Sequence, residues 1–242
     1  MSLRTPDDAV SEDLTMERGE SHPESVRGAR GRQPRQAPDV RLSKTLSYIL
    51  RHGAAKLGFV MGKDGFLNVD EILRHPQCKR YTEQDVQRVV ETNSKQRFTL
   101  RTHPETGILQ IRANQGHTVQ VEDLELISIS VDAGNVPEEA VHGTYLQHWP
   151  SIKTRGLRRM SRTHIHLAPG LPAEEGVVSG MRSDCDLAVF IEIRRALNDG
   201  IPFYFSTNWV ILTPGNDEGV LPPEYFQKVL QLKPTRRLLP LE

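Results

Sequence analysis

Residues 43–52 read Ser-Lys-Thr-Leu-Ser-Tyr-Ile-Leu-Arg-His and predict a helix that ends in an adjacent Arg–His pair. The large apolar residues here recur at helical spacing and form one face: Leu42, Leu46, Ile49 and Leu50. Arg51 and His52 then lie at a helix C-terminus, where the macrodipole favours cations and helps to keep His52 protonated. Two cationic donors held on one rigid turn suit a phosphate group.

The residues at either end of this predicted helix set its limits. Ser43 is a candidate N-cap, and Gly53 stands just past the last turn, where helices commonly stop. An Arg–His pair alone is more often solvated surface than a binding site. A phosphate site therefore needs support from other parts of the chain.

The net charge of zero over 242 residues hides a basic segment. Residues 41–101 carry 12 Lys and Arg against 6 Asp and Glu, a net charge of +6, whereas the rest of the chain is acidic overall. Such a segment is the electrostatic footprint of a module that binds a polyanion. A solvated basic surface without a ligand is the alternative interpretation.

Length and composition favour an intracellular globular protein. With 242 residues, 37% of them hydrophobic and 26% charged, the chain can hold two compact domains or one large one. No apolar run approaches the roughly 18 residues of a membrane span, and we expect no secretory signal. Cys78 and Cys185 are too few and too far apart for a disulfide framework, which favours a reducing compartment, cytoplasmic or nuclear.

Residues 40–125 predict one small α+β lobe. Its expected elements are helices over 43–52, 70–75 and 82–91, then strands over 97–100 and 108–112. Thr82 and Asp85 approximate a capping box at the start of the third helix, and a turn at 104–107 joins the strands. Three helices followed by a β-hairpin are typical of a winged helix, a common nucleic-acid-binding arrangement.

Residues 126–235 predict a second, β-rich lobe that begins with a connector at 126–135. Its expected elements are strands at 141–145, 165–167, 189–193, 203–205 and 210–212, and helices near 147–155, 172–180 and 222–230. The pattern lacks a βαβ rhythm and a glycine-rich dinucleotide motif, so a dinucleotide would have to bind in another way. We expect residues 1–39 to be a disordered tail and residues 236–242 a C-terminal tail.

Arg51, His52 and Arg97 form a candidate phosphate site if the strands of the first lobe pack against its first helix. A phosphate monoester carries about −1.5 to −2 charges at pH 7. Two guanidiniums and an imidazolium match that charge and its acceptor geometry. Because the dianion needs no general base to act as a nucleophile, cations rather than carboxylates dominate the site.

The second lobe carries two histidine motifs. In His142-Gly143-Thr144, Gly143 lets the backbone approach a ligand closely, and His142 can hydrogen-bond a ribose hydroxyl. The nine histidines of the chain invite a metal site. We expect none, because we place the His164 and His166 rings on opposite faces of a strand, where they cannot easily share one metal ion.

Five motifs, taken in order, resemble one known family. They are Leu-Arg-His at 50–52, Asn-Ser-Lys-Gln-Arg-Phe at 93–98, Ile-Arg-Ala-Asn-Gln-Gly-His at 111–117, Val-His-Gly-Thr at 141–144 and Met-Ser-Arg-Thr-His-Ile-His-Leu at 160–167. This set resembles the RNA 2′-phosphotransferases, the NAD-dependent tRNA 2′-phosphotransferase family. The resemblance covers about residues 41–235.

The resemblance implies an enzyme with an N-terminal winged-helix lobe and a C-terminal lobe like the ADP-ribosyltransferases. The implied reaction moves the splice-junction 2′-phosphate of RNA to NAD and releases nicotinamide and ADP-ribose 1″,2″-cyclic phosphate. The implied catalytic residues are Arg51, His52, Arg97 and Arg162. The implied NAD-binding residues are His142, Gly143, Thr144, Ser161, His166 and Arg182.

One departure from the wider ADP-ribosyltransferase pattern bears on the substrate. Those enzymes often place a Glu on a third strand, where this chain has Val210. The departure disfavours ADP-ribosylation of proteins and fits a phosphate acceptor, which needs no activation. Two alternatives stay open: NAD-dependent ADP-ribosylation of terminal nucleic-acid phosphates, and a winged-helix RNA-binding protein without catalysis.

The remaining expectations concern partners and packing. We expect 2′-phosphorylated RNA, tRNA above all, as the partner of a monomeric chain with no membrane association. We expect the Gln-Gly-His motif at 115–117 to close onto RNA or to hold the lobes together. Trp149 and Trp209 are expected in the core.

Overall fold

The computed structural model describes residues 38–172, 177, 180–182 and 184–241, which belong to one compact unit over residues 36–242. Almost all of the expected disordered tail at 1–39 lies outside the described residues. None of the described helices is long and apolar enough to cross a membrane. We refer to residues 38–125 as the N-terminal lobe and to residues 126–241 as the C-terminal lobe.

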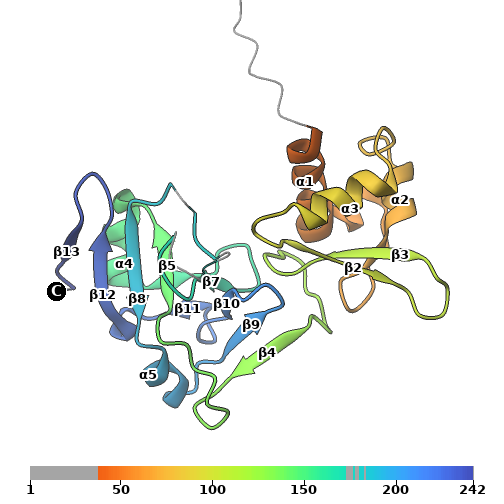
Figure 1. Ribbon diagram of the computed structural model, residues 1–242. Coiled ribbons are helices and arrows are strands. Elements are labelled where there is room, and N and C mark those ends of the chain that lie inside the picture. The colour runs from red at the N-terminus through yellow and green to blue at the C-terminus, as the bar shows by residue number, and fades with distance from the viewer. Residues whose placement is uncertain (1–37, 173–176, 178–179, 183, 242) are drawn as a thin grey trace, which may run out of the picture. The chain divides into compact units, whose positions relative to one another are not determined.

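The N-terminal lobe contains three α-helices and a three-stranded antiparallel sheet with strand order β1-β3-β2. Its elements are α1 (Pro38–Tyr48), a π-helical turn (Ile49–Gly53), a 3-10 turn (Ala55–Leu57), β1 (Leu67–Asn68), α2 (Val69–Arg74), α3 (Glu83–Glu91), β2 (Phe98–Thr102) and β3 (Leu109–Ala113). Figure 1 shows the three helices packed beside the β2–β3 hairpin. The predicted helices and hairpin are confirmed; the name winged helix stays a prediction.

The first helix buries the apolar face that its sequence predicts. Its four apolar residues, Leu42, Leu46, Ile49 and Leu50, are all 0% exposed. The prediction that Ser43 caps the helix is wrong, because α1 begins at Pro38 and Ser43 lies inside it. The Ser43 hydroxyl accepts a hydrogen bond from the Asn93 side chain instead, over 3.4 Å.

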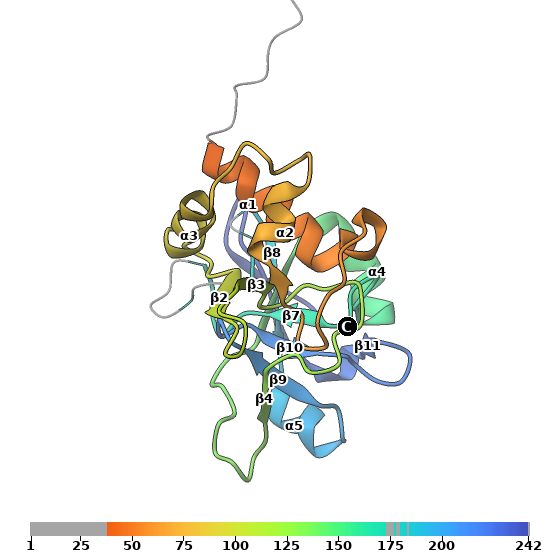
Figure 2. The same ribbon diagram turned by 90° about the vertical axis from the view of Figure 1, so that its right-hand side faces the viewer.

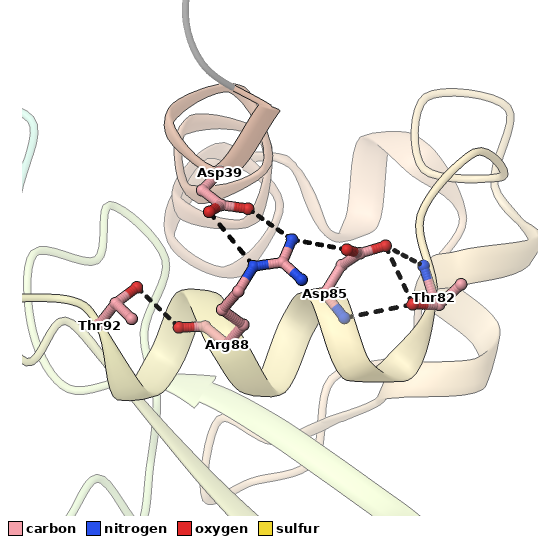
Figure 3. Close-up of polar contacts among 5 residues, drawn as sticks. All are labelled: Asp39, Thr82, Asp85, Arg88 and Thr92. Atoms are coloured by element: carbon pink, nitrogen blue, oxygen red, sulfur yellow. Dashed lines mark hydrogen bonds and ion pairs between the residues drawn. The ribbon is translucent and has the colours of Figure 1, made fainter.

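Arg88 ties α3 to the first turn of α1 (Figure 3). The predicted capping box is present: the Thr82 hydroxyl accepts from the Asp85 N–H over 3.2 Å, and the Asp85 carboxylate accepts from the Thr82 N–H over 2.8 Å. Arg88 then bonds Asp85 over 2.6 Å and Asp39 over 2.7 Å. This chain of contacts fixes two helices that border the site described below.

The C-terminal lobe has two four-stranded sheets, with orders β4-β9-β10-β7 and β13-β12-β8-β5, and a small β11-β6 ladder. Its elements are β4 (Leu126–Ile129), β5 (Val141–Thr144), α4 (Trp149–Arg155), β6 (Leu157–Arg158), β7 (Ile165–Leu167), β8 (Leu187–Ile191), α5 (Ile193–Asn198), β9 (Phe203–Ser206), β10 (Ile211–Thr213), β11 (Val220–Leu221), β12 (Phe226–Gln231) and β13 (Arg237–Leu239). In Figure 2 the strands β7, β10, β9 and β4 follow one another. A bridge between Val141 and Ala168 links the two sheets, so β5 lies beside the end of β7.

Three expectations for this lobe are wrong. The connector at 126–135 contains β4, which pairs with β9 and buries Ile129. The helix near 222–230 is a 3-10 turn (Pro223–Tyr225) followed by β12, because pairing with β8 and β13 overrides local helical spacing. The tail at 236–242 contains β13.

Two further expectations concern the helix near 172–180 and the class of the fold. The helix near 172–180 falls mostly outside the described residues. The α+β class is confirmed by the mixed helices and sheets. That the second lobe is like the ADP-ribosyltransferases stays a prediction.

Candidate active site

A cavity of about 440 Å³ collects the predicted site residues of both lobes. The N-terminal lobe contributes Arg51, Lys95, Arg97 and Gln115 to its lining. From the C-terminal lobe come, among others, His142, Gly143, Thr144, Ser161, Arg162, His166 and Arg182. Every predicted catalytic or NAD-binding residue except His52 therefore lines one cavity, whose size is typical of ligand pockets.

The lining of this cavity is strongly cationic. Its charged members are Arg51, Lys95, Arg97, Arg158, Arg159, Arg162 and Arg182. No Asp or Glu is among the described residues that line it. Cations confined in a cleft focus the field and attract an anion, so the expected ligand carries phosphate groups.

Arg51 lies on the π-helical turn with its guanidinium against the backbone of Gly116. Gly116 has φ +89°, and a Cβ there would lie 3.4 Å from Arg51 Cζ. Two of the Arg51 nitrogens, Nε and Nη2, are buried without a hydrogen-bond partner among the described residues. Burial, Arg97 and Arg162 together lower the pKa of Arg51 to about 10, so it remains charged at pH 7 with donors available to an anion.

Arg97 and Arg162 complete a triad of arginines. Arg97 Nη1 donates to the Asn93 side-chain oxygen over 3.1 Å, which fixes the guanidinium at the edge of the cavity. Met160, two residues before Arg162, has a φ of +56°, which marks a tight turn. Loss of surrounding water lowers the pKa of both arginines, and Arg182 lowers that of Arg162 further. Three like charges held together, with no Asp or Glu among the described lining residues, are a site for a polyvalent anion.

His52 borders a neighbouring groove, which shares Arg97 with the cavity. Its Nδ1 lies 3.1 Å from the Thr118 hydroxyl, which lies 3.3 Å from the Arg51 carbonyl oxygen. Because the hydroxyl has one proton to donate to that carbonyl, it accepts from His52 Nδ1–H. In the neutral ring Nε2 is then the unprotonated nitrogen.

The charge state of His52 differs from the expectation. Burial lowers the pKa of His52, and the charges of Arg51 and Arg162 lower it further. The prediction that the helix terminus keeps His52 protonated is therefore wrong for the free protein. Two nearby guanidiniums and lost water outweigh a macrodipole effect of about 0.3–1 kcal/mol.

The histidines of the C-terminal lobe are held by the β5–β7 neighbourhood. His142 Nδ1–H donates to the His166 carbonyl oxygen over 2.9 Å. Burial lowers the pKa of His142 and holds that of His166 well below its usual range. The His166 Nε2 is buried and has no partner among the described residues. Both rings are neutral at pH 7 and offer hydrogen bonds rather than charge.

Gly143 permits a close approach to its backbone, but the group that approaches is a protein side chain and not a ligand. A Cβ at this position would lie 2.1 Å from Met181 Cγ, so Met181 fills the space expected for a ligand. The Met181 carbonyl oxygen accepts from Lys95 Nζ over 3.3 Å. Arg182 Nη1 reaches the Tyr145 hydroxyl over 3.5 Å, which donates to Asp184 over 2.9 Å. These contacts place Arg182 at the exposed side of the cavity.

The Gln-Gly-His motif at 115–117 holds the lobes together, one of its two expected roles. The His117 carbonyl oxygen accepts from the Thr163 N–H over 3.0 Å. The His117 ring is 1% exposed, and neither ring nitrogen has a partner among the described residues. Burial, with Arg51, His52, His164 and Arg112 nearby, lowers the pKa of His117 to about 4.

Two candidate site residues, Lys95 and Thr118, were given no role from the sequence. Lys95 lies inside the quoted motif at 93–98, and Thr118 directly follows the Gln-Gly-His motif, so a role for every polar residue in and beside each motif would have included both. His164 and His166 line the same cavity, so the expectation that their rings point to opposite faces is wrong, since residues two apart along a strand share a face. Among the described residues, no group of three or more possible ligand residues gathers as a metal site.

The two tryptophans differ. Trp149 is buried, as predicted, whereas Trp209 is 57% exposed and the prediction that it lies in the core is wrong. Trp209 has φ +59° in the turn before β10, which swings its ring outward against Phe205. Val210 beside it is fully buried, so the third-strand position faces the interior.

Comparison with known proteins places this site in a family. The pattern of the RNA 2′-phosphotransferase, Tpt1 / KptA family matches residues 37–215. A zebrafish (Danio rerio) protein named tRNA 2′-phosphotransferase 1 is 59% identical over 210 residues, which are 86% of this chain and 93% of that protein. The human protein of the same name is 56% identical over 89% of this chain and 85% of its own length. The tRNA 2′-phosphotransferase of Saccharomyces cerevisiae is 37% identical over 79% of this chain and 84% of its own length. The chain belongs to the RNA 2′-phosphotransferase, Tpt1 / KptA family.

Proposed function

We propose that this protein removes a 2′-phosphate from RNA, tRNA above all, by transferring it to NAD. The observation that carries the proposal is the arginine triad of Arg51, Arg97 and Arg162, whose cavity lining has no carboxylate among the described residues. Relatives that match most of this chain are named tRNA 2′-phosphotransferases, which supports the RNA substrate. The proposal combines that substrate with the anion chemistry of the cavity.

NAD supplies an electrophilic C1″ that a 2′-phosphate oxygen attacks as nicotinamide leaves, and a 2″-hydroxyl that then attacks phosphorus to free the RNA 2′-oxygen. The arginines act on the phosphate. Arg51 has two buried nitrogens without a partner among the described residues, and Arg97 and Arg162 add one guanidinium from each lobe to the cavity lining. Fixed guanidiniums need no reorganisation when charge shifts, which makes them effective in a water-poor cleft.

His52 is suited to give a proton to the leaving RNA 2′-oxygen. Its Nδ1 is committed to Thr118, so Nε2 is the nitrogen available to the substrate. The lowered pKa of His52 in the free protein rises when a phosphate dianion lies beside the ring, because an opposite charge favours the protonated form. Protonation is thereby coupled to the arrival of the substrate.

The C-terminal lobe fits a dinucleotide. The orphaned His166 Nε2 and the His142 ring offer hydrogen bonds to ribose hydroxyls, as expected for a neutral sugar. Arg182 at the exposed side of the cavity suits a pyrophosphate. Ser161 and Thr144 add hydroxyl groups to the same lining.

Incubation with NAD and a short RNA carrying one internal 2′-phosphate tests the proposal. We expect stoichiometric nicotinamide, ADP-ribose 1″,2″-cyclic phosphate and RNA with a free 2′-hydroxyl, each identified by mass spectrometry. RNA with a 3′-terminal phosphate is the control. Accumulation of RNA that retains ADP-ribose would favour ADP-ribosylation of nucleic-acid phosphates. Binding without NAD consumption would favour an RNA-binding protein.

A further inference from the structure

Two hollows follow the exposed side of α1 outside the catalytic cavity. The first, about 500 Å³, is lined by residues that include Ser43, Ser47, His52, Asn93 and Arg97. The second, about 670 Å³, is lined by Arg41, Lys44, Thr45, Tyr48, Pro76, Gln77, Lys79 and Arg80. Lys44 and Tyr48 line both hollows, so the two form one continuous surface. We call this surface the α1 track.

The α1 track is positively charged along its length. The second hollow has Arg41, Lys44, Lys79 and Arg80 in its lining, and no carboxylate among the described residues there. In the first hollow the acidic lining residue is Asp39, whose carboxylate bonds Arg88 (Figure 3). The hydrogen bond from Arg88 keeps the pKa of Asp39 below its usual range, so this charge is paired and does not oppose an anion.

The track continues into the reaction centre. Arg97 lines both the first hollow and the catalytic cavity, and His52 borders the hollow beside it. A molecule whose phosphate is held by Arg97 therefore has a polar, cationic path leading away along α1. The opposite wall of the cavity belongs to the C-terminal lobe, which the proposed function assigns to NAD.

Tyr48 gives the track an aromatic surface at its middle. The side chain is 45% exposed, and its ring centroid lies 6.4 Å from that of His52 at an interplanar angle of 51°. The ring also lies over Gly53, where a Cβ would be 2.6 Å from Tyr48 Cε1, so the ring has a rigid support. An exposed ring between cations is the arrangement that binds single-stranded nucleic acid, because every unpaired base offers a face for stacking.

We propose that the α1 track binds unpaired ribonucleotides that flank the 2′-phosphate, with Tyr48 stacked on one base and Arg41 and Lys79 against backbone phosphates. The proposal rests on the proposed function for the position of the phosphate. It adds a substrate preference: the phosphate must lie in single-stranded RNA, because paired bases expose no face to Tyr48. Hybridising the flanking nucleotides to a complementary strand should therefore weaken both binding and turnover.

Tyr48→Leu and Tyr48→Phe test the stacking, with Trp209→Leu as the control for loss of an exposed ring elsewhere. With a single-stranded 2′-phosphorylated RNA, Tyr48→Leu should raise the KM for RNA at least about five-fold and leave kcat and the KM for NAD nearly unchanged. Tyr48→Phe and Trp209→Leu should behave as the wild type. With abasic flanking nucleotides, wild type and Tyr48→Leu should become equal.

The abasic substrate separates stacking from support of the turn that carries Arg51. If Tyr48→Leu lowered kcat equally on normal and abasic RNA, the ring would be structural and the stacking proposal wrong. If the wild type bound duplex and single-stranded RNA equally well, the preference for unpaired RNA would be wrong.

Salt dependence of RNA binding, measured by fluorescence titration without NAD, tests the cations. Arg41→Ala/Lys79→Ala should lower the slope of log K against log salt by about 1.4, since each contact to a single strand contributes about 0.7. Lys56→Ala/Arg155→Ala removes the same charges from exposed positions outside the track and should leave the slope as in the wild type.

Equal slopes of log K against log salt for the two double variants would disprove the proposal that the α1 track binds RNA phosphates. This titration needs no turnover, so it separates the two proposals. A protein that binds RNA through the track but forms no cyclic phosphate would disprove the proposed function alone.

Discussion

The two lobes treat their polar site residues in opposite ways. The N-terminal lobe buries arginines that keep their charge: even the lowered pKa of Arg51, about 10, leaves it protonated at pH 7. The C-terminal lobe holds half-buried imidazoles, His142 and His166, whose pKa values burial keeps below the usual range. Its Arg162 is the exception, because it adds a third guanidinium to the charged side of the cavity. The same loss of water thus gives a charged wall for an anion and a neutral wall for a sugar.

The largest expected effect comes from breaking either wall separately. Arg51→Ala should lower turnover on the order of 10²–10³-fold, the loss typical of removing one preorganised donor. The same change should weaken the binding of RNA and leave the binding of NAD unchanged. His142→Ala should weaken the binding of NAD and leave the binding of 2′-phosphorylated RNA nearly intact. Separate titrations of each ligand decide the matter. Loss of NAD affinity with full RNA affinity in Arg51→Ala would reverse the assignment of the lobes.

One neutral imidazole is buried in the N-terminal lobe, that of His117, and it predicts a loss of stability in acid. The pKa of His117 is about 4 in the folded protein against about 6.5 unfolded, so the unfolded chain binds more protons between these values. The contribution of the neutral His117 ring to the free energy of unfolding is fully present above pH 6.5. It is lost as the pH drops towards 4, by up to about 3 kcal/mol. Urea unfolding of His117→Leu should show a flatter decline over that range. The exposed His148→Leu serves as control, and an unchanged slope in His117→Leu would contradict the assignment.

Arg97→Lys sharpens the picture of the charged wall. Lysine keeps the charge but lacks the planar guanidinium, which can donate to Asn93 and to a phosphate oxygen at the same time. We expect kcat/KM to fall about ten-fold or more, almost as far as in Arg97→Ala. Near-normal turnover by the lysine variant would mean that charge alone suffices there.

Thr118 offers a smaller test on the same wall. Thr118→Val removes the hydroxyl that holds His52 Nδ1 and should lower kcat about five-fold, the value of one hydrogen bond near 1 kcal/mol. The pH–rate profile should shift with it, while Thr118→Ser should restore both. A purely structural role would change stability without moving the profile.

The smallest effect is expected from the N-terminal segment. Residues 1–37 are rich in Ser, Gly, Pro, Arg and Glu, a composition that predicts no buried segment, so their deletion should leave turnover within roughly three-fold and thermal unfolding unchanged. Both are measured on the truncated protein beside the full chain. A collapse of either would show that this segment takes part in binding or packing.

The sequence by itself determined the local elements of the N-terminal lobe. The spacing of four apolar residues predicted the buried face of α1, and Thr82 with Asp85 predicted the cap of α3. The motifs also contain many of the residues that line the cavity, although Arg158, Arg159 and Met181 lie outside them. Helical spacing and caps depend on residues within one turn of each other, so a sequence reveals them directly.

Only the tertiary structure decided the charge state of His52, the pairing of β4 and β12, and the exposure of Trp209. Each depends on groups far away in the chain. The pKa of His52 is lowered because burial removes water and because Arg51 and Arg162 lie close, and β12 forms because β8 and β13 flank it. Desolvation and strand pairing act through space, so local patterns such as a helix end or an apolar spacing do not reveal them.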